Sequence, residues 1–215
     1  MKKNLTEIVF ILDRSGSMGG LVDDTIGGFN SMIRKQADAE GQAYVSTVLF
    51  DNQTEVIHDR VDIRQIRPLT RNEYYVRGST ALLDAVGKSI HHIRNVHRYA
   101  REEDRPEKTL FIITTDGMEN ASREYSYERV REMIAHEKEK NGWEFLFLGA
   151  NIDAVKEAAR FGINQDRAAT YHADHRGTAV IYEAMGDAVR TLRASKSMSA
   201  EWKQSVDEDY NSRHK

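Results

Sequence analysis

The sequence predicts an α/β fold in which helices cover both faces of a mostly parallel β-sheet. Short apolar runs alternate along the chain with amphipathic patterns of about 10–20 residues, which is the order of a doubly wound sheet. Residues 5–13 and 109–115 are apolar on both sides, as central parallel strands are. The length of 215 residues suits one such domain.

The N-terminal half is predicted to hold three strands and two helices. Glycines end the first strand at 5–13, and a helix follows with apolar residues four, three and four positions apart, at Val22, Ile26, Phe29 and Ile33. Residues 43–50 and 54–61 flank a turn sequence, which predicts a hairpin that adds one antiparallel edge strand. The polar segment 62–79 leads into a second helix at 81–100.

The C-terminal half continues the alternation. Strands are expected at 109–115, 143–149 and 168–172, and helices at 126–140, 153–161 and 178–192. Gly162 follows the short helix as a left-handed cap. We expect the domain to occupy residues 1–195, and the polar residues 196–215 to form a tail or a frayed helix.

Composition excludes several classes of protein. A hydrophobic content of 40% argues against general disorder, and the absence of Cys excludes disulfides and thiolate metal sites. The net charge of -3, from 31 basic and 34 acidic residues, argues against a nucleic-acid partner. No apolar run approaches the ~20 residues of a membrane span, and the N-terminal run is too short for a secretion signal. We therefore expect a cytoplasmic protein with no membrane partner.

The candidate site lies where an open sheet binds its ligands, beyond the carboxyl ends of the strands. Asp13 ends the first strand and Asp116 follows the fourth. Two carboxylates in one crevice repel each other unless a cation lies between them. Ser15, Ser17 and Thr80 add neutral hydroxyl oxygens, and an all-oxygen set of this kind suits Mg²⁺ or Mn²⁺.

Three motifs in this order resemble the von Willebrand factor type A domain. They are Asp-x-Ser-x-Ser after the first strand, the Thr of Gly-Ser-Thr-Ala-Leu at 78–82, and Thr-Asp-Gly after the fourth strand. The resemblance covers about residues 5–195, and the stretch 142–151 is most similar to the short, free-standing bacterial members.

This resemblance implies a six-stranded Rossmann-like sheet with one antiparallel edge strand. It also implies a metal-ion-dependent adhesion site whose ligands are Asp13, Ser15, Ser17, Thr80 and Asp116. Such a site binds a protein partner, because the metal accepts an Asp or Glu side chain from it. The expected function is thus a Mg²⁺-dependent protein-binding module, not an enzyme.

Two alternatives compete with this hypothesis. Asp13 and Asp116 each precede a predicted helix, so both could be helix N-caps. Asp13 could also accept a phosphoryl group in a Mg²⁺-dependent transferase or hydrolase, since its place at the end of the first strand suits that chemistry. Against the second alternative, Ser15 stands where such enzymes usually have another carboxylate.

A basic segment before Thr80 is the candidate partner-binding rim. Residues 60–77 carry a net charge of +3 within an acidic chain. Arg and Tyr are enriched in binding hot spots, and positive charge steers an acidic partner. The rim is predicted to contain Arg64, Arg67, Arg71, Tyr74, Tyr75 and Arg77. A solvated loop with no binding role is the alternative.

Overall fold

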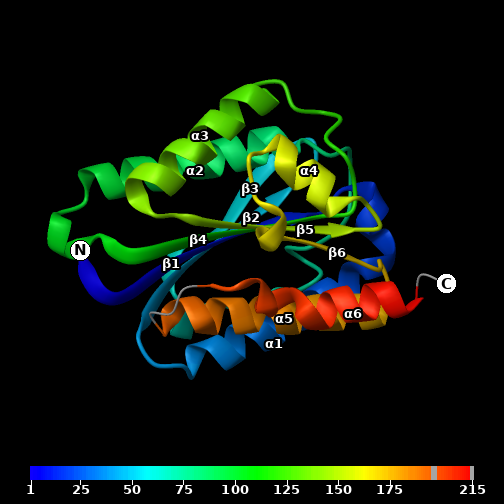
Figure 1. Ribbon diagram of the computed structural model, residues 1–215, viewed down its shortest axis with the longest axis horizontal. Coiled ribbons are helices and arrows are strands. Elements are labelled where there is room, and N and C mark those ends of the chain that lie inside the picture. The colour runs from blue at the N-terminus through cyan, green and yellow to red at the C-terminus, as the bar shows by residue number, and fades with distance from the viewer. Residues whose placement is uncertain (195–197, 214–215) are drawn as a thin grey trace.

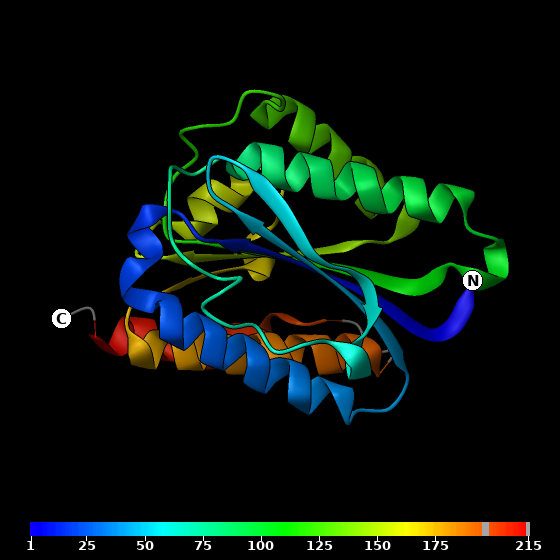
Figure 2. The ribbon, with the colours of Figure 1, turned by 180° about the vertical axis from the view of Figure 1, so that it is seen from behind.

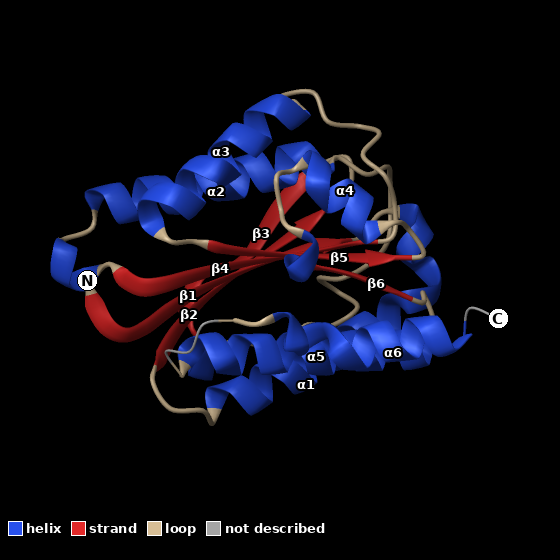
Figure 3. Ribbon diagram, viewed as in Figure 1, coloured by secondary structure: helices blue, strands red, loops and turns tan. Residues whose placement is uncertain are grey.

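The computed structural model describes residues 1–194 and 198–213, and these form one six-stranded sheet between two helical layers (Figure 1, Figure 3). The strand order is β3-β2-β1-β4-β5-β6. The strands are β1 (Lys2–Asp13), β2 (Gln42–Phe50), β3 (Thr54–Asp62), β4 (Pro106–Thr115), β5 (Glu144–Ala150) and β6 (Ala168–Tyr171). Only β3 of the described strands runs antiparallel to its neighbour. The predicted fold class is confirmed.

Helices cover both faces of the sheet (Figure 1). One layer contains α2 (Leu82–Tyr99), α3 (Tyr127–Asn141) and α4 (Ala154–Arg160), and the other contains α1 (Val22–Ala37), α5 (His175–Arg193) and α6 (Gln204–Arg213). Each layer buries its own apolar cluster against the sheet. The central strands supply both clusters, because their side chains alternate between the two faces. This explains why β1 and β4 are apolar throughout.

The register brings three strand ends to one edge of the sheet. β1 lies between β2 and β4 and is parallel to both. Asp13 is level with Phe50, and Leu12 is level with Thr114. The loops that follow β1, β2 and β4 therefore start side by side.

β3, the outermost strand, runs antiparallel to β2 and leads the chain away from the carboxyl ends of β1, β2 and β4. Thr54 pairs with Phe50 at the start of β3, whereas Asp62 pairs with Tyr44 at its end. A short 3-10 helix, η2 (Ile63–Gln65), follows, and Figure 2 shows the next segment returning along the hairpin towards the strand ends.

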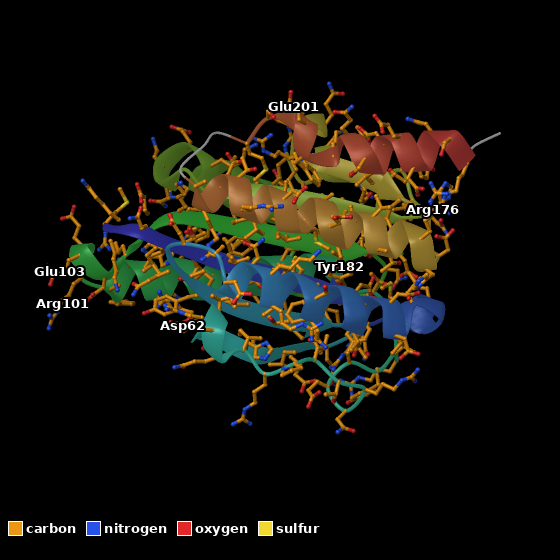
Figure 4. All side chains as sticks on the ribbon, turned by 90° about the horizontal axis from the view of Figure 1, so that it is seen from below. Asp62, Arg101, Glu103, Arg176, Tyr182 and Glu201 are labelled. Atoms are coloured by element: carbon orange, nitrogen blue, oxygen red, sulfur yellow. The ribbon has the colours of Figure 1, made fainter. Side chains whose placement is uncertain are left out.

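One of the two glycines in the predicted first helix has a packing role, and neither breaks the helix. α1 begins after the 3-10 helix η1 (Gly16–Leu21) and contains Gly27 and Gly28 without interruption. The ring of Tyr182, on α5, lies so close to Gly28 that no Cβ would fit there. Figure 4 labels Tyr182 between the two helices. Gly28 lowers the helix propensity of α1, but a residue without a Cβ is needed there because α1 and α5 pack so closely.

The C-terminal segment forms the 3-10 helix η5 (Ala200–Lys203) and then α6. Trp202 and Val206 are buried, and the Trp202 Nε1 donates to the Asp166 carbonyl at 2.9 Å. The segment expected to be a tail or a frayed helix therefore packs one side against α5 and β6. The expected boundary at 195–196 and residues 214–215 lie outside the described residues. Within the described ranges, no helix is both long and apolar enough to span a bilayer.

Candidate functional site

Asp13 lies at the end of β1 with both carboxylate oxygens engaged. Its Oδ1 accepts the backbone N–H of Ser15 at 2.7 Å, which turns the chain sharply after the strand. Its Oδ2 accepts the Thr115 hydroxyl at 2.6 Å from the end of the adjacent β4. Asp13 is completely buried. The carboxylate is therefore held by one local contact and one cross-strand contact.

A chain of hydroxyl groups connects this position to Asp116. The Ser17 hydroxyl donates to Asp116 Oδ1 at 2.6 Å, and the Ser15 and Ser17 hydroxyl oxygens lie 3.1 Å apart. Ser15 is buried, whereas Ser17 is exposed. Because Ser15 also donates its N–H to Asp13, the four predicted residues form one connected group.

Thr80 reaches the same group from the segment before α2. Its N–H donates to Asn120 Oδ1, and its carbonyl accepts the Asn120 N–H, both at 3.0 Å. A Cβ built on Gly117 would lie 3.2 Å from Thr80 Oγ1 and 3.9 Å from Ser17 Oγ. Both hydroxyls therefore face the residue that follows Asp116. The structure brings all five predicted oxygen-bearing residues together, and Gly117 leaves room for their side chains.

Asp13 is buried and Asp116 is half-buried, and burial shifts the pKa of each carboxyl group. Burial raises the pKa of Asp13 to about 6, although the hydrogen bonds from Thr115 and Ser15 favour the charged form. The negative charge of Asp116 raises the Asp13 pKa further. Burial also raises the pKa of Asp116, against the hydrogen bond from Ser17. A cation placed between these carboxylates would offset both the repulsion and the lost hydration.

The donor chemistry fits a small hard cation. Two carboxylates and three hydroxyls give only oxygen donors, which is the set that Mg²⁺ and Mn²⁺ prefer. In the described part of the chain, no group of three or more His, Cys, Asp or Glu side chains is arranged so that it could hold a metal ion. Hydroxyl oxygens would therefore have to complete the coordination of any metal bound here.

The helix-cap alternative is wrong for both aspartates. α1 starts at Val22, nine residues after Asp13, and its N-cap residue is Leu21. α3 starts at Tyr127, and Ser126 caps it by accepting the Arg129 N–H. Neither aspartate has a helix N-terminus to cap.

The predicted rim is split between two ends of the molecule. Arg64 follows the far end of β3, since the preceding Asp62 pairs with Tyr44 at the start of β2. Figure 4 labels Asp62 towards the end that carries Arg101 and Glu103, away from Arg176 at the start of α5. Arg64 therefore does not lie beside Thr80.

Most of the positive charge in this segment is already paired. Arg60 contacts Glu7, Arg64 contacts Asp62, Arg71 contacts Asp23, and Arg77 contacts Asp51. Arg67 is exposed. Arg60, Arg71 and Arg77 pair with acidic residues from outside the segment, and this reduces the net positive field that the sequence indicated. The side chains that remain near the strand ends are Arg71, Tyr75 and Arg77.

Tyr74 is a correction to the predicted rim. It is completely buried, and its hydroxyl donates to the backbone carbonyl of Asp13 at 2.5 Å. Burial raises its pKa well above the ordinary value. Tyr74 therefore supports the loop that contains Asp13, Ser15 and Ser17, and it is not available to a partner. Its neighbour Tyr75 is 43% exposed, as expected when consecutive residues of an extended chain face opposite ways.

Several supporting residues were missed by the sequence analysis. Glu119 accepts the Leu83 N–H and two N–H groups of its own loop, so it ties the segment after β4 to the start of α2. Asp84 accepts three more N–H groups from residues 123–125. For Asp84 the only signal was its position in the first turn of the helix predicted at 81–100, and Glu119 had no such signal.

Comparisons with known proteins place the fold. The sequence matches no protein-family model and no curated protein. Among solved structures, the chain is similar to the vWF domain of the type V pili tip protein Mfa5 from Porphyromonas gingivalis, with TM-score 0.60 and 10% identity over 90% of this chain and 97% of that one. It is also similar to manganese-loaded TRAP protein from Plasmodium vivax, with TM-score 0.59 and 20% identity over 83% and 72%.

A von Willebrand factor type A structure from Catenulispora acidiphila matches with TM-score 0.57 and 13% identity, over 86% of this chain and 42% of that chain. The chain spans less than half the length of several solved chains that it resembles. At these identities the likeness concerns the fold. Together with the strand order and the single antiparallel edge strand, it shows that the chain has a von Willebrand factor type A fold.

Proposed function

We propose that this chain is a protein-binding module whose affinity depends on a divalent cation. The observation that carries the proposal is the connected group of Asp13, Ser15, Ser17 and Asp116, with the Thr80 hydroxyl beside it. These five residues would hold Mg²⁺ or Mn²⁺. When bound, the metal supplies an electron-poor centre that accepts an external carboxylate.

The neutral donors favour binding over catalysis. Three of the five proposed ligands are uncharged hydroxyls, so the bound metal keeps much of its positive charge for an Asp or Glu of a protein partner. The manganese-loaded TRAP structure shows that a neighbour of the same fold holds a divalent metal. The chemistry of the site defines the partner only by the carboxylate that it presents to the metal. Cytoplasmic localisation stays a prediction from the sequence.

The enzymatic alternative needs a carboxylate oxygen of Asp13 that is free to attack phosphorus. Both oxygens accept short hydrogen bonds, at 2.7 Å from Ser15 and 2.6 Å from Thr115, which stabilise the carboxylate and lower its nucleophilicity. That arrangement supports a ligand or structural role. Turnover of a generic phosphate ester in Mg²⁺, abolished by Asp13→Asn, would favour the enzyme and contradict the proposal.

The proposal is tested in two stages. Mn²⁺ titration of the wild type, followed by water-proton relaxation, should show one bound ion, and Asp116→Ala should lose it while remaining folded. Affinity capture is then run with Mg²⁺, with chelator, and with Asp116→Ala as bait in Mg²⁺. A true partner is retained only by the wild type in Mg²⁺. A wild type that binds no Mn²⁺, or a partner retained equally in chelator, would overturn the proposal.

A further inference from the structure

Arg14, the residue between Asp13 and Ser15, is a buried cation. Its side chain is 0% exposed, although it lies in the loop that carries three of the proposed metal ligands. Its Nε donates to Asp51 Oδ2 at 3.0 Å, and its Nη1 donates to the Glu73 carbonyl at 3.3 Å. Its Nη2 forms an ion pair with Glu55 at 2.7 Å. A fully buried Arg is rare unless it is paired in this way.

Asp51 is the buried partner of Arg14, and it binds three other parts of the site. Its Oδ2 also accepts Arg77 Nε at 2.7 Å, and its Oδ1 accepts the Gln53 N–H at 2.8 Å. The Asp51 carbonyl accepts the N–H of Ala81 at 2.8 Å, directly beside Thr80. The pair therefore connects the loop after β1, the turn after β2 and the segment before α2.

Backbone hydrogen bonds follow the same connection. The Arg77 N–H donates to the Arg14 carbonyl at 3.0 Å, and the Gly16 N–H donates to the Gly78 carbonyl at 3.2 Å. Gly78 has φ +65 and lies so close to Asn52 that a Cβ would collide with it. The segment before Thr80 is thus fitted tightly against the loops that contain Arg14 and Asp51.

We propose that the buried Arg14–Asp51 ion pair positions the metal ligands, because it holds the loop of Asp13, Ser15 and Ser17 at a fixed distance from Thr80. The proposal rests on the proposed function only in that these residues bind the metal. Arg14 and Asp51 are positioning residues, since neither belongs to the ligand set.

The charged groups around the Arg14–Asp51 pair balance one another. Arg14 and Arg77 bring two positive charges, and Asp51 and Glu55 bring two negative ones. A buried Arg next to a metal ligand would repel a divalent cation if it were uncompensated. Asp51→Asn should therefore harm the site in two ways, by loosening the loops and by leaving the Arg14 charge exposed to the metal.

The test compares variants of this pair with a matched pair elsewhere. Arg14→Met and Asp51→Asn should weaken Mn²⁺ binding by about 10–100-fold, the usual effect of losing a residue that orients metal ligands. Arg94→Met is the control, since Arg94 also pairs with a fully buried carboxylate, Glu137 at 2.5 Å, but between α2 and α3. It should lower thermal stability and leave Mn²⁺ affinity within about twofold, since the pair is remote from the ligands. All titrations are made at a temperature where circular dichroism shows each variant to be folded.

Amide hydrogen exchange gives a measurement that does not depend on metal. In metal-free Arg14→Met, the N–H groups of Gly16, Arg77 and Ala81 should exchange faster, while those of the β1 core keep wild-type protection. Arg14→Lys keeps the charge but loses the planar fork, so it should not restore affinity or protection. If Arg14→Met does not fold, the Mn²⁺ titration and the exchange measurement are made on Arg14→Lys instead.

The outcomes separate the two proposals. If the wild type binds no Mn²⁺, the proposed function fails, and the exchange data alone decide whether the pair fixes the loops. If the wild type binds Mn²⁺ but the pair variants bind it within twofold of wild type, the positioning role is overturned. An equal loss of affinity in Arg94→Met would also overturn it, because the effect would then be general destabilisation.

Discussion

Lowering the pH from about 7.5 to about 5 should weaken metal binding through protonation of Asp13. Burial and the nearby Asp116 raise the Asp13 pKa to about 6 in the metal-free protein. With that value, about 97% of the protein carries an ionised Asp13 near pH 7.5 but only about 9% near pH 5. Since the metal needs the carboxylate form, its apparent affinity should fall roughly tenfold over this range. The raised pKa of Asp116 acts in the same direction.

The assay is Mn²⁺ titration at several pH values and constant ionic strength. A parallel carbon-NMR titration of the metal-free protein should place the Asp13 carboxyl midpoint near 6. An Mn²⁺ affinity that changes less than about twofold between the two pH values would refute the reasoning, because a tenfold change follows from the fraction ionised.

The same shift predicts the stability of the metal-free protein. An acid whose pKa is raised on folding binds more protons in the native state than in the unfolded state between the two pKa values. The resulting stability is present below the ordinary Asp value of 3.8 and is lost as the pH rises through about 6. Asp13 therefore makes the metal-free protein less stable near pH 7.5 than near pH 5. Saturating Mg²⁺ should raise the melting temperature more at the higher pH, because the metal binds only the native ionised site.

Three further results are expected. Tyr74→Phe should lower the free energy of unfolding by about 1–3 kcal/mol, because it leaves the Asp13 carbonyl without its buried donor; thermal melts check this. Thr80→Ala should weaken Mn²⁺ binding at least about tenfold with a smaller effect on folding, measured by relaxation titration and denaturant unfolding. Arg71→Ser should slow partner association and reduce its salt dependence, whereas Arg64→Ser should change neither. Both arginines are exposed and ion-paired, so stopped-flow mixing at varied salt compares like with like. Equal effects of the two substitutions would contradict the placement of the rim.

The sheet and the ends of its central strands could be predicted from the sequence for a physical reason. β1 and β4 are buried on both faces, so their apolar runs are continuous and fix both their identity and their approximate limits. Parallel pairing then brings the residues after them to one edge. Asp13 is the last residue of β1 and Asp116 follows β4, so the two strand patterns were enough to predict that residues 103 positions apart lie close together. The start of β1 was placed three residues late because Lys2 and Lys3 are charged, yet Lys2 pairs with Pro106.

The supporting residues depend on contacts that no local pattern contains. Asp51 had the sequence features of an ordinary turn residue, and it does accept the N–H of Gln53 as such residues do. Its burial comes from Arg14 and Arg77, which approach from two other loops. Tyr74 likewise lies in an irregular polar segment, and only the return of that segment beneath β1 brings its hydroxyl to Asp13.

The basic segment shows why charge along a sequence is a weak guide to charge in space. The net charge of +3 over residues 60–77 counts Asp62 and Glu73, but it leaves out the acidic residues from other segments that the fold brings to these arginines. In the fold, Arg60 lies against the buried Glu7 and Arg77 against the buried Asp51, both contributed by strands or turns distant in sequence. Each pair cancels positive charge that a partner would otherwise meet. An acidic partner should therefore be guided mainly by the metal and by the few cations beside it. This is why removing the metal should affect association more than removing any single arginine of the segment.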